Sequence, residues 1–173
     1  QEGTPAVRKR ILSMAWDEED ILSNDDIIEA MNKKDDVSSE AIIVVGRRKL
    51  DHVISDLEPL LLSENLETCA SAAAAILEID SGPTEQATSI LDDMLNRKDE
   101  LAQATALKRL TNNENILPQE KLIHFLNNEN SLISNVALTI AEKRDDDRLL
   151  PAITKNLAIS KTSLQARQTL QKF

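Results

Sequence analysis

Apolar residues recur in pairs six positions apart along this chain. The five pairs are Met31 and Val37, Leu60 and Leu66, Leu95 and Leu101, Leu126 and Leu132, and Ala158 and Leu164. Successive pairs begin 29, 35, 31 and 32 residues apart, which is the period of stacked helical repeats. Each pair encloses a short link, so the pattern predicts five turns, each of which joins the two helices of a hairpin.

Helical periodicity on both sides of these turns sets the expected elements. A hairpin of this size cannot bury its apolar face alone, so neighbouring hairpins are expected to stack. The two helices of each predicted hairpin, in chain order, are 25–32 and 38–47, then 50–62 and 66–79, then 84–96 and 100–110. The fourth hairpin pairs a helix that begins at Pro118 with 132–144, and the fifth pairs 148–159 with 162–172.

Local signals mark several helix ends. Ser23 followed by Asp26 matches a capping box, and Asn65 is suited to cap the helix that begins at Leu66. Pro59 is expected to kink the helix over 50–62. The stretch Asp80 to Pro83 is the strongest break in the chain, with Gly82 suited to the left-handed position after a helix.

Composition agrees with an all-α protein. The chain of 173 residues has only 3 Gly and 5 Pro, and its one β-branched run, Ile42 to Val45, reads better as a buried helical turn than as a strand. The sequence therefore predicts an α-solenoid of about five stacked antiparallel helical hairpins. We expect residues 1–22 to form an N-terminal extension or cap and residues 23–173 to form one repeat domain.

The stretch Asp146 to Ile153 resembles the link between units in HEAT-like, armadillo-like repeats of the phycobilisome-lyase type, in which an acidic turn leads into a leucine-rich helix. The resemblance covers residues 25–173 and implies a right-handed solenoid. Such repeats often carry Arg just after the apolar residue that opens the second helix. Here that position holds Ser38, Glu67, Ala102, Ile133 and Gln165, so the usual inter-repeat Asp–Arg ladder is missing.

The chain is acidic overall, with 30 acidic and 20 basic residues and a formal net charge of -10. It has one Trp, two Phe and no Tyr, so it lacks both the cationic surface and the stacking platforms of nucleic-acid-binding proteins. Residues 148–173 are an exception, because they hold five cations and no carboxylate side chain. This basic segment could dock on its neighbour, on a partner or on another copy, or it could be a chance scatter of solvated charge.

No group of residues predicts catalysis, a metal or a cofactor. Asp145 to Asp147 is the densest carboxylate run, but helix capping explains it better than a calcium loop does. His52 and His124 are 72 residues apart and are expected on or near the surface. Cys69 is expected to be a buried structural residue, with a reactive thiol as the alternative.

The N-terminal segment has two interpretations. Trp16 precedes the acidic run Asp17 to Asp20 and follows the basic run Arg8 to Arg10. With Ile11, Leu12 and Leu22 it could anchor a partner helix, but we favour a cap over the first repeat. No apolar stretch approaches the ~20 residues that cross a bilayer. A cytoplasmic location is slightly favoured, although a signal peptide removed before Gln1 would mean export.

These observations favour a non-catalytic interaction or scaffold module. The second helices of the five hairpins are expected to line a concave surface that binds a protein or peptide, with a basic segment favoured by the acidic charge. We expect one residue on each of these helices to contact the partner: Glu40, Glu67, Gln103, Asn135 and Arg167. The alternatives are a chromophore-lyase-like or other enzyme on a HEAT scaffold, and a nucleic-acid-binding protein, which charge and aromatic content disfavour.

Overall fold

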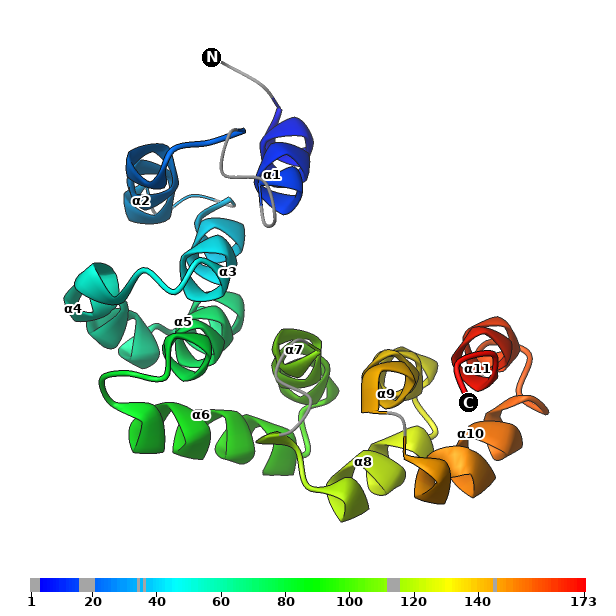
Figure 1. Cartoon of the computed structure of the whole chain (residues 1–173). Coiled ribbons are helices and arrows are strands. Elements are labelled where there is room, and N and C mark those ends of the chain that lie inside the picture. The colour runs from blue at the N-terminus through cyan, green and yellow to red at the C-terminus, as the bar shows by residue number, and fades with distance from the viewer. Residues whose placement is uncertain (1–3, 16–20, 34, 36, 112–115, 145) are drawn as a thin grey trace. The chain divides into compact units, whose positions relative to one another are not determined.

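Every regular element that the structure describes is a helix (Figure 1). The computed structural model describes residues 4–15, 21–33, 35, 37–111, 116–144 and 146–173. Within them the all-α prediction is confirmed, and Ile42 to Val45 lie in a helix as expected. No helix in these residues combines the length and apolar character needed to cross a membrane.

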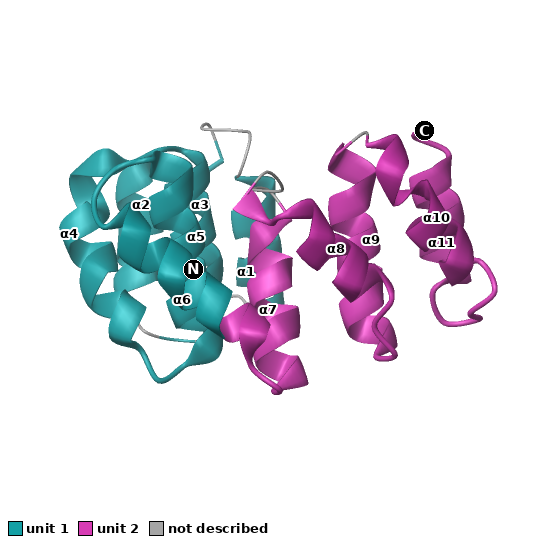
Figure 2. Ribbon diagram, turned by 90° about the horizontal axis from the view of Figure 1, so that it is seen from below, with its two compact units in different colours: residues 1–93 teal, residues 94–173 magenta. Residues whose placement is uncertain are grey.

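The chain divides into two compact units, residues 1–93 and residues 94–173, coloured separately in Figure 2. We call them unit 1 and unit 2. The division falls near the end of α6 (Thr84–Asn96). Each unit is built from helices joined by the predicted turns, because all five six-residue steps span a link between two helices.

Unit 1 arranges its helices in two layers. In the first layer, α1 packs on α3 and α3 packs on α5, while α2 and the segment before α5 form the second layer (Figure 1). The elements before α6 are α1 (Pro5–Met14), α2 (Asn24–Asn32), α3 (Ser38–Arg47), η1 (Asp51–Val53), α4 (Ile54–Leu57), η2 (Glu58–Leu62) and α5 (Leu66–Ile79), where η denotes a 3-10 helix.

The contact between α3 and α5 is unusually close. A Cβ atom added to Gly46 would lie 2.6 Å from the Cα atom of Ala75 and 2.9 Å from its Cβ atom. Ala72, Ala73 and Ala75 are buried on α5, so small side chains on both helices allow their backbones to approach. The small residues of α5 and Gly46 of α3 therefore bring the two backbones together.

Unit 2 repeats the two-layer arrangement. Helices α7, α9 and α11 pack in sequence in one layer, and α8 and α10 contact α9 and α11 from the other. Its elements after α6 are α7 (Glu100–Leu110), α8 (Gln119–Leu126), α9 (Ser131–Arg144), η4 (Asp147–Leu149), α10 (Leu150–Asn156) and α11 (Ser163–Leu170). Leu107, Leu122, Leu126 and Ile140 are almost completely buried in its core.

Predicted helix caps are confirmed at several positions. Ser23 and Asp26 form a capping box, in which the Ser23 Oγ accepts from the Asp26 N–H and the Asp26 carboxylate accepts from the Ser23 N–H. The Asn65 Oδ1 accepts from the N–H groups of Glu67 and Thr68. Asp146 caps η4 by accepting from the Arg148 N–H.

Two local predictions were wrong. Residues 50–62 do not form one kinked helix, because a 3-10 turn, a single α-turn and a second 3-10 segment divide them, with Pro59 in the first turn of η2. The residue in the left-handed conformation directly after α5 is Asp80, with φ 58°, whereas Gly82 adopts φ 79° two residues later. Gly82 fits there because an added Cβ atom would lie 2.7 Å from the Ile54 Cγ2 atom.

The second apolar residue of the six-residue step does not have one environment throughout the chain. Val37 is the N-cap of α3 and is 2% exposed, and Leu66 is the first residue of α5 and half-buried. Leu101, Leu132 and Leu164 are each the second residue of their helices and are 57–70% exposed. Each residue advances about 100° around a helix, so this shift turns the side chain from the core to solvent.

The predicted N-terminal extension contains α1, whose Leu12 is buried and which packs on α3. Arg48, after α3, donates from Nη2 to the Ala15 carbonyl oxygen at 2.8 Å and from Nη1 to the Leu22 carbonyl oxygen at 2.9 Å. It thus holds both ends of the segment between α1 and α2. Trp16 and the run Asp17 to Asp20 lie outside the described residues.

Candidate functional site

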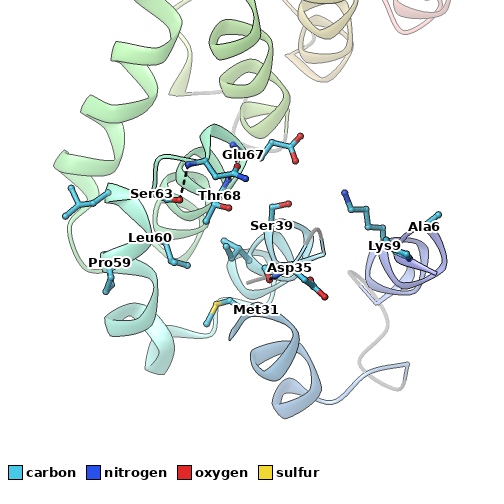
Figure 3. A pocket seen from close by; sticks show the side chains of 15 residues that line it. Ala6, Lys9, Met31, Asp35, Ser39, Pro59, Leu60, Ser63, Glu67 and Thr68 are labelled. Atoms are coloured by element: carbon cyan, nitrogen blue, oxygen red, sulfur yellow. Dashed lines mark hydrogen bonds between the residues drawn. The ribbon is translucent and has the colours of Figure 1, made fainter. Parts of the chain in front are cut away.

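Unit 1 contains an open groove of about 740 Å³ that runs across the N-terminal turns of α1, α3 and α5. The other side of the groove comes from the end of α2 and from η2, so the first two six-residue steps frame it (Figure 3). We call it the turn groove and define it by its lining residues: Pro5, Ala6, Lys9, Met31, Asp35, Ser38, Ser39, Ile42, Pro59, Leu60, Leu62, Ser63, Asn65, Glu67 and Thr68.

A hydrogen-bonded turn between α2 and α3 fixes one part of the groove. The Asp35 carboxylate accepts from the Val37 N–H at 2.9 Å and pairs with the Arg8 Nη1 atom of α1 at 2.7 Å. The Ser38 Oγ accepts from the Asp35 N–H and donates to the Ala30 carbonyl oxygen. The Val37 N–H and then the Arg8 guanidinium lower the pKa of Asp35, so the carboxylate stays ionised and ties α1 to this turn.

The groove combines an apolar base with charged walls. Met31 and Ile42 are buried beneath it, whereas Leu62 is 79% exposed at its edge. Glu67 of α5 and Lys9 of α1 stand on opposite walls (Figure 3). This mixture of apolar surface and charges of both signs is suited to a polypeptide segment, because such a segment offers side chains of each kind.

Ser39 lies between the two charged walls. The residue is 6% exposed and lines the groove. In Figure 3 the hydroxyl group points toward the space between Glu67 and Lys9. A hydroxyl group in this position can donate to or accept from the backbone of a bound segment.

The five residues expected to contact a partner have different surroundings. Glu67 lines the turn groove and is exposed, and Glu40 is half-buried on α3 outside the groove lining. In unit 2, the Gln103 amide donates to the carbonyl oxygens of Leu95 and Arg97, and the Asn135 amide donates to the Lys161 carbonyl oxygen. Gln103 and Asn135 therefore stabilise turns, whereas Arg167 is exposed on α11.

The other chemistry-bearing residues do not form a site with the groove. His52 and His124 are exposed, with the His124 ring edge-on to Phe125 at 5.5 Å. Cys69 is buried, as predicted, and its thiol donates to the Leu61 carbonyl oxygen at 3.1 Å. Where side chains are described, no three His, Cys, Asp or Glu residues are grouped to hold a metal ion. Asp145 lies outside that part of the chain.

Sequence reasoning missed Lys9, Ser39 and Leu62 as site residues. The available signal was the pair of turns between Met31 and Val37 and between Leu60 and Leu66, which border the groove. The turns predicted hairpins, whereas the partner surface was predicted along the faces of the second helices and not at the turns. The position of α1 beside them depends on its packing against α3, which no local pattern reveals.

The resemblance to HEAT-like repeats rests on the sequence pattern alone. The chain matches no protein-family model, and no curated protein matches it. The assignment to HEAT-like repeats therefore stays a prediction.

Proposed function

We propose that this protein is a non-catalytic interaction module that binds an extended, basic segment of a partner protein in the turn groove. The groove itself carries this proposal, because it is long enough to cross three helices and joins apolar surface to polar walls. The two-layer stacking within each unit supports the wider proposal that the protein is an α-solenoid of HEAT-like hairpins, a class that commonly binds other proteins.

The charge of unit 1 supports a basic partner. Residues 1–93 carry 21 acidic and 8 basic side chains. In the groove, Asp35 already pairs with Arg8, whereas Glu67 is exposed and faces the open space. A cationic side chain of the partner would meet Glu67, and an apolar side chain would cover Leu62.

A displayed library of unstructured 12-residue peptides, selected on the full chain, tests this proposal. We expect selected peptides to be enriched in Lys or Arg and in aliphatic residues. Leu62→Asp should weaken their binding by about tenfold, because it places a charge on the apolar contact, and Glu67→Gln by about two- to fivefold. Glu58→Gln, at an exposed position of η2 outside the groove lining, is the matched control.

Salt provides a second measurement. Raising the ionic strength should weaken the selected peptides, because partly exposed ion pairs are screened. Binding that is unchanged by both Leu62→Asp and Glu67→Gln would place the peptides elsewhere and refute the proposal. Binding that depends on Leu62 but not on salt would refute the preference for a basic partner.

A further inference from the structure

Helix α1 presents an apolar stripe to solvent. Val7, Ile11 and Met14 are 50%, 39% and 52% exposed. They occupy positions i, i+4 and i+7, so they share one face of the helix. The buried residues Leu12 and Ala15 lie on a different face, and α1 packs on α3.

The stripe lies where other helices of the same layer have a partner. Helix α3 packs against α2, α5 against η2, α9 against α8, and α11 against α10, in each case the element that precedes it in its hairpin. Helix α1 makes its extensive contacts with α3. Each of these four helices is therefore paired with a second-layer element, whereas no described helix is paired with α1 in this way.

A cavity of about 360 Å³ lies at this same position, between α1 and α2. Ile11 and Leu12 line it from α1, Leu22 and Ala30 from the α2 side, and Val37 from the turn before α3. The charged residues Arg8, Asp26, Lys33 and Asp35 complete the lining. Ile11 belongs to both the cavity and the stripe, so the two surfaces adjoin at this residue. In unit 2 the second-layer helices α8 and α10 contact each other, and a helix paired with α1 would contact α2 across this cavity in the same way.

The charges around the stripe indicate which helix would bind. Arg8 and Arg10 flank the stripe on opposite sides around α1, Lys9 lies on the face away from it, and residues 4–15 include no acidic residue. Arg8 pairs with Asp35, whereas Arg10 is exposed. A second copy of α1 would bring the same cations into the contact, so self-pairing is electrostatically unfavourable, and an acidic helix is favoured.

We propose that the stripe and cavity together bind an amphipathic helix of a partner protein, with acidic side chains flanking its apolar face. The bound helix takes the second-layer position beside α1 and completes a hairpin with it. Its apolar residues cover Val7, Ile11 and Met14 and enter the cavity, and its acidic residues meet Arg10. The stripe lies on a different face of α1 from Lys9 of the turn groove, and the cavity shares only Asp35 with that groove, so the inference does not depend on the proposed function.

A displayed library of helical peptides, randomised over the whole helix surface and selected on the full chain, tests this inference. We expect the selected helices to have apolar residues spaced three and four apart, flanked by Glu or Asp. Ile11→Asp should weaken their binding by at least about tenfold, because it removes the central apolar contact. Arg10→Gln should weaken it by about two- to fivefold.

Leu62→Asp is the matched control, because it makes the same kind of change at an exposed apolar residue of the turn groove. It should leave the helical peptides unaffected, just as Ile11→Asp should leave the extended peptides of the turn groove unaffected. Circular dichroism of each variant checks that it remains folded. Failure to select helices, or selected helices that tolerate Ile11→Asp, would overturn the inference. Self-association of the full chain that Ile11→Asp abolishes would assign the surface to a second copy and also overturn it.

Discussion

The two units differ in charge although they share one helical design. Residues 1–93 carry 21 acidic and 8 basic side chains, whereas residues 94–173 carry 9 acidic and 12 basic ones. Within unit 1 the helix α1 reverses this trend with Arg8, Lys9 and Arg10. Because the core of each unit is apolar, charge is free to vary on the surface without altering the fold. The common design therefore leaves each unit with its own electrostatic preference.

The units also expose different apolar residues at equivalent turns. In unit 1, Val37 turns into the core and the exposed apolar residues lie on α1 and at Leu62. In unit 2, Leu101, Leu132 and Leu164 are exposed at the second position of successive helices. A shift of one or two residues in where a helix begins is enough to cause this difference. Equal spacing in a sequence thus does not guarantee equal burial.

Polar side chains fix the connections of the two units in different ways. In unit 1 the Arg48 guanidinium donates to Ala15 and Leu22 across more than twenty residues of chain. In unit 2 the buried Asn156 amide donates to the carbonyl oxygens of Leu126 and Ala152, and the Thr162 hydroxyl donates to the Asn156 carbonyl oxygen. Ala15 and Leu126 stand at the C-terminal ends of α1 and α8, where carbonyl groups would otherwise lack a partner within the helix.

The largest expected effect comes from cavities in the two cores. Ile27 of α2 and Ile140 of α9 are both 0% exposed. Changing either one to Ala should lower the free energy of unfolding by about 3 kcal/mol, because apolar contacts are lost and a cavity remains. Hydrogen exchange measured by mass spectrometry should show the loss of protection mainly in unit 1 for Ile27→Ala and mainly in unit 2 for Ile140→Ala.

Equal loss of protection across both units in each variant would show that the units unfold together. They would then differ in their surfaces but not in their stability. A control is Ser55→Ala, at an exposed position of α4, which should leave protection unchanged in both units.

A smaller effect tests a feature of unit 1 alone. Gly46→Ala places a methyl group against the backbone of Ala75 and should lower stability by about 1–2 kcal/mol, because overpacking outweighs the better helix propensity of Ala. Chemical denaturation of the full chain measures the change. A stability equal to or above that of the original chain would show that α3 and α5 can separate slightly at no cost.

The smallest effect concerns acid sensitivity in unit 1. The pKa of Asp35 is lowered in the folded protein by the Val37 N–H and by Arg8, so the ionised carboxylate stabilises the fold above the unfolded pKa of about 3.9. This stabilisation is lost as the pH falls through the lowered folded pKa. Asp35→Asn should cost about 0.5–1 kcal/mol at neutral pH, since the side chain is partly exposed, and almost nothing near pH 2.

Denaturation of both proteins at neutral and acidic pH measures this difference. Asp56→Asn, at an exposed carboxylate of α4, is the control. If Asp35→Asn cost the same at both pH values, the side chain would act through packing rather than through its charge.

The sequence predicted most helix boundaries to within one or two residues but missed where helices meet. The signals at Ser23, Asn65 and Asp146 act between neighbours in the chain, so they are visible without a structure. The division of residues 50–62 was not predicted, because apolar periodicity alone does not separate 3-10 from α-helical turns. The groove was missed because its walls come from α1, α3 and α5, which lie far apart along the chain.

The sequence by itself determined the all-α class, the five turns and the acidic character of the first half, because helix propensity, capping and charge are properties of short stretches. The tertiary structure decided which face each helix buries. It placed Glu67, Ser39 and Lys9 around one groove, and it left Val7, Ile11 and Met14 beside a cavity. These outcomes depend on the packing of α1 and α5 against α3, which is a sum of many weak contacts between distant residues.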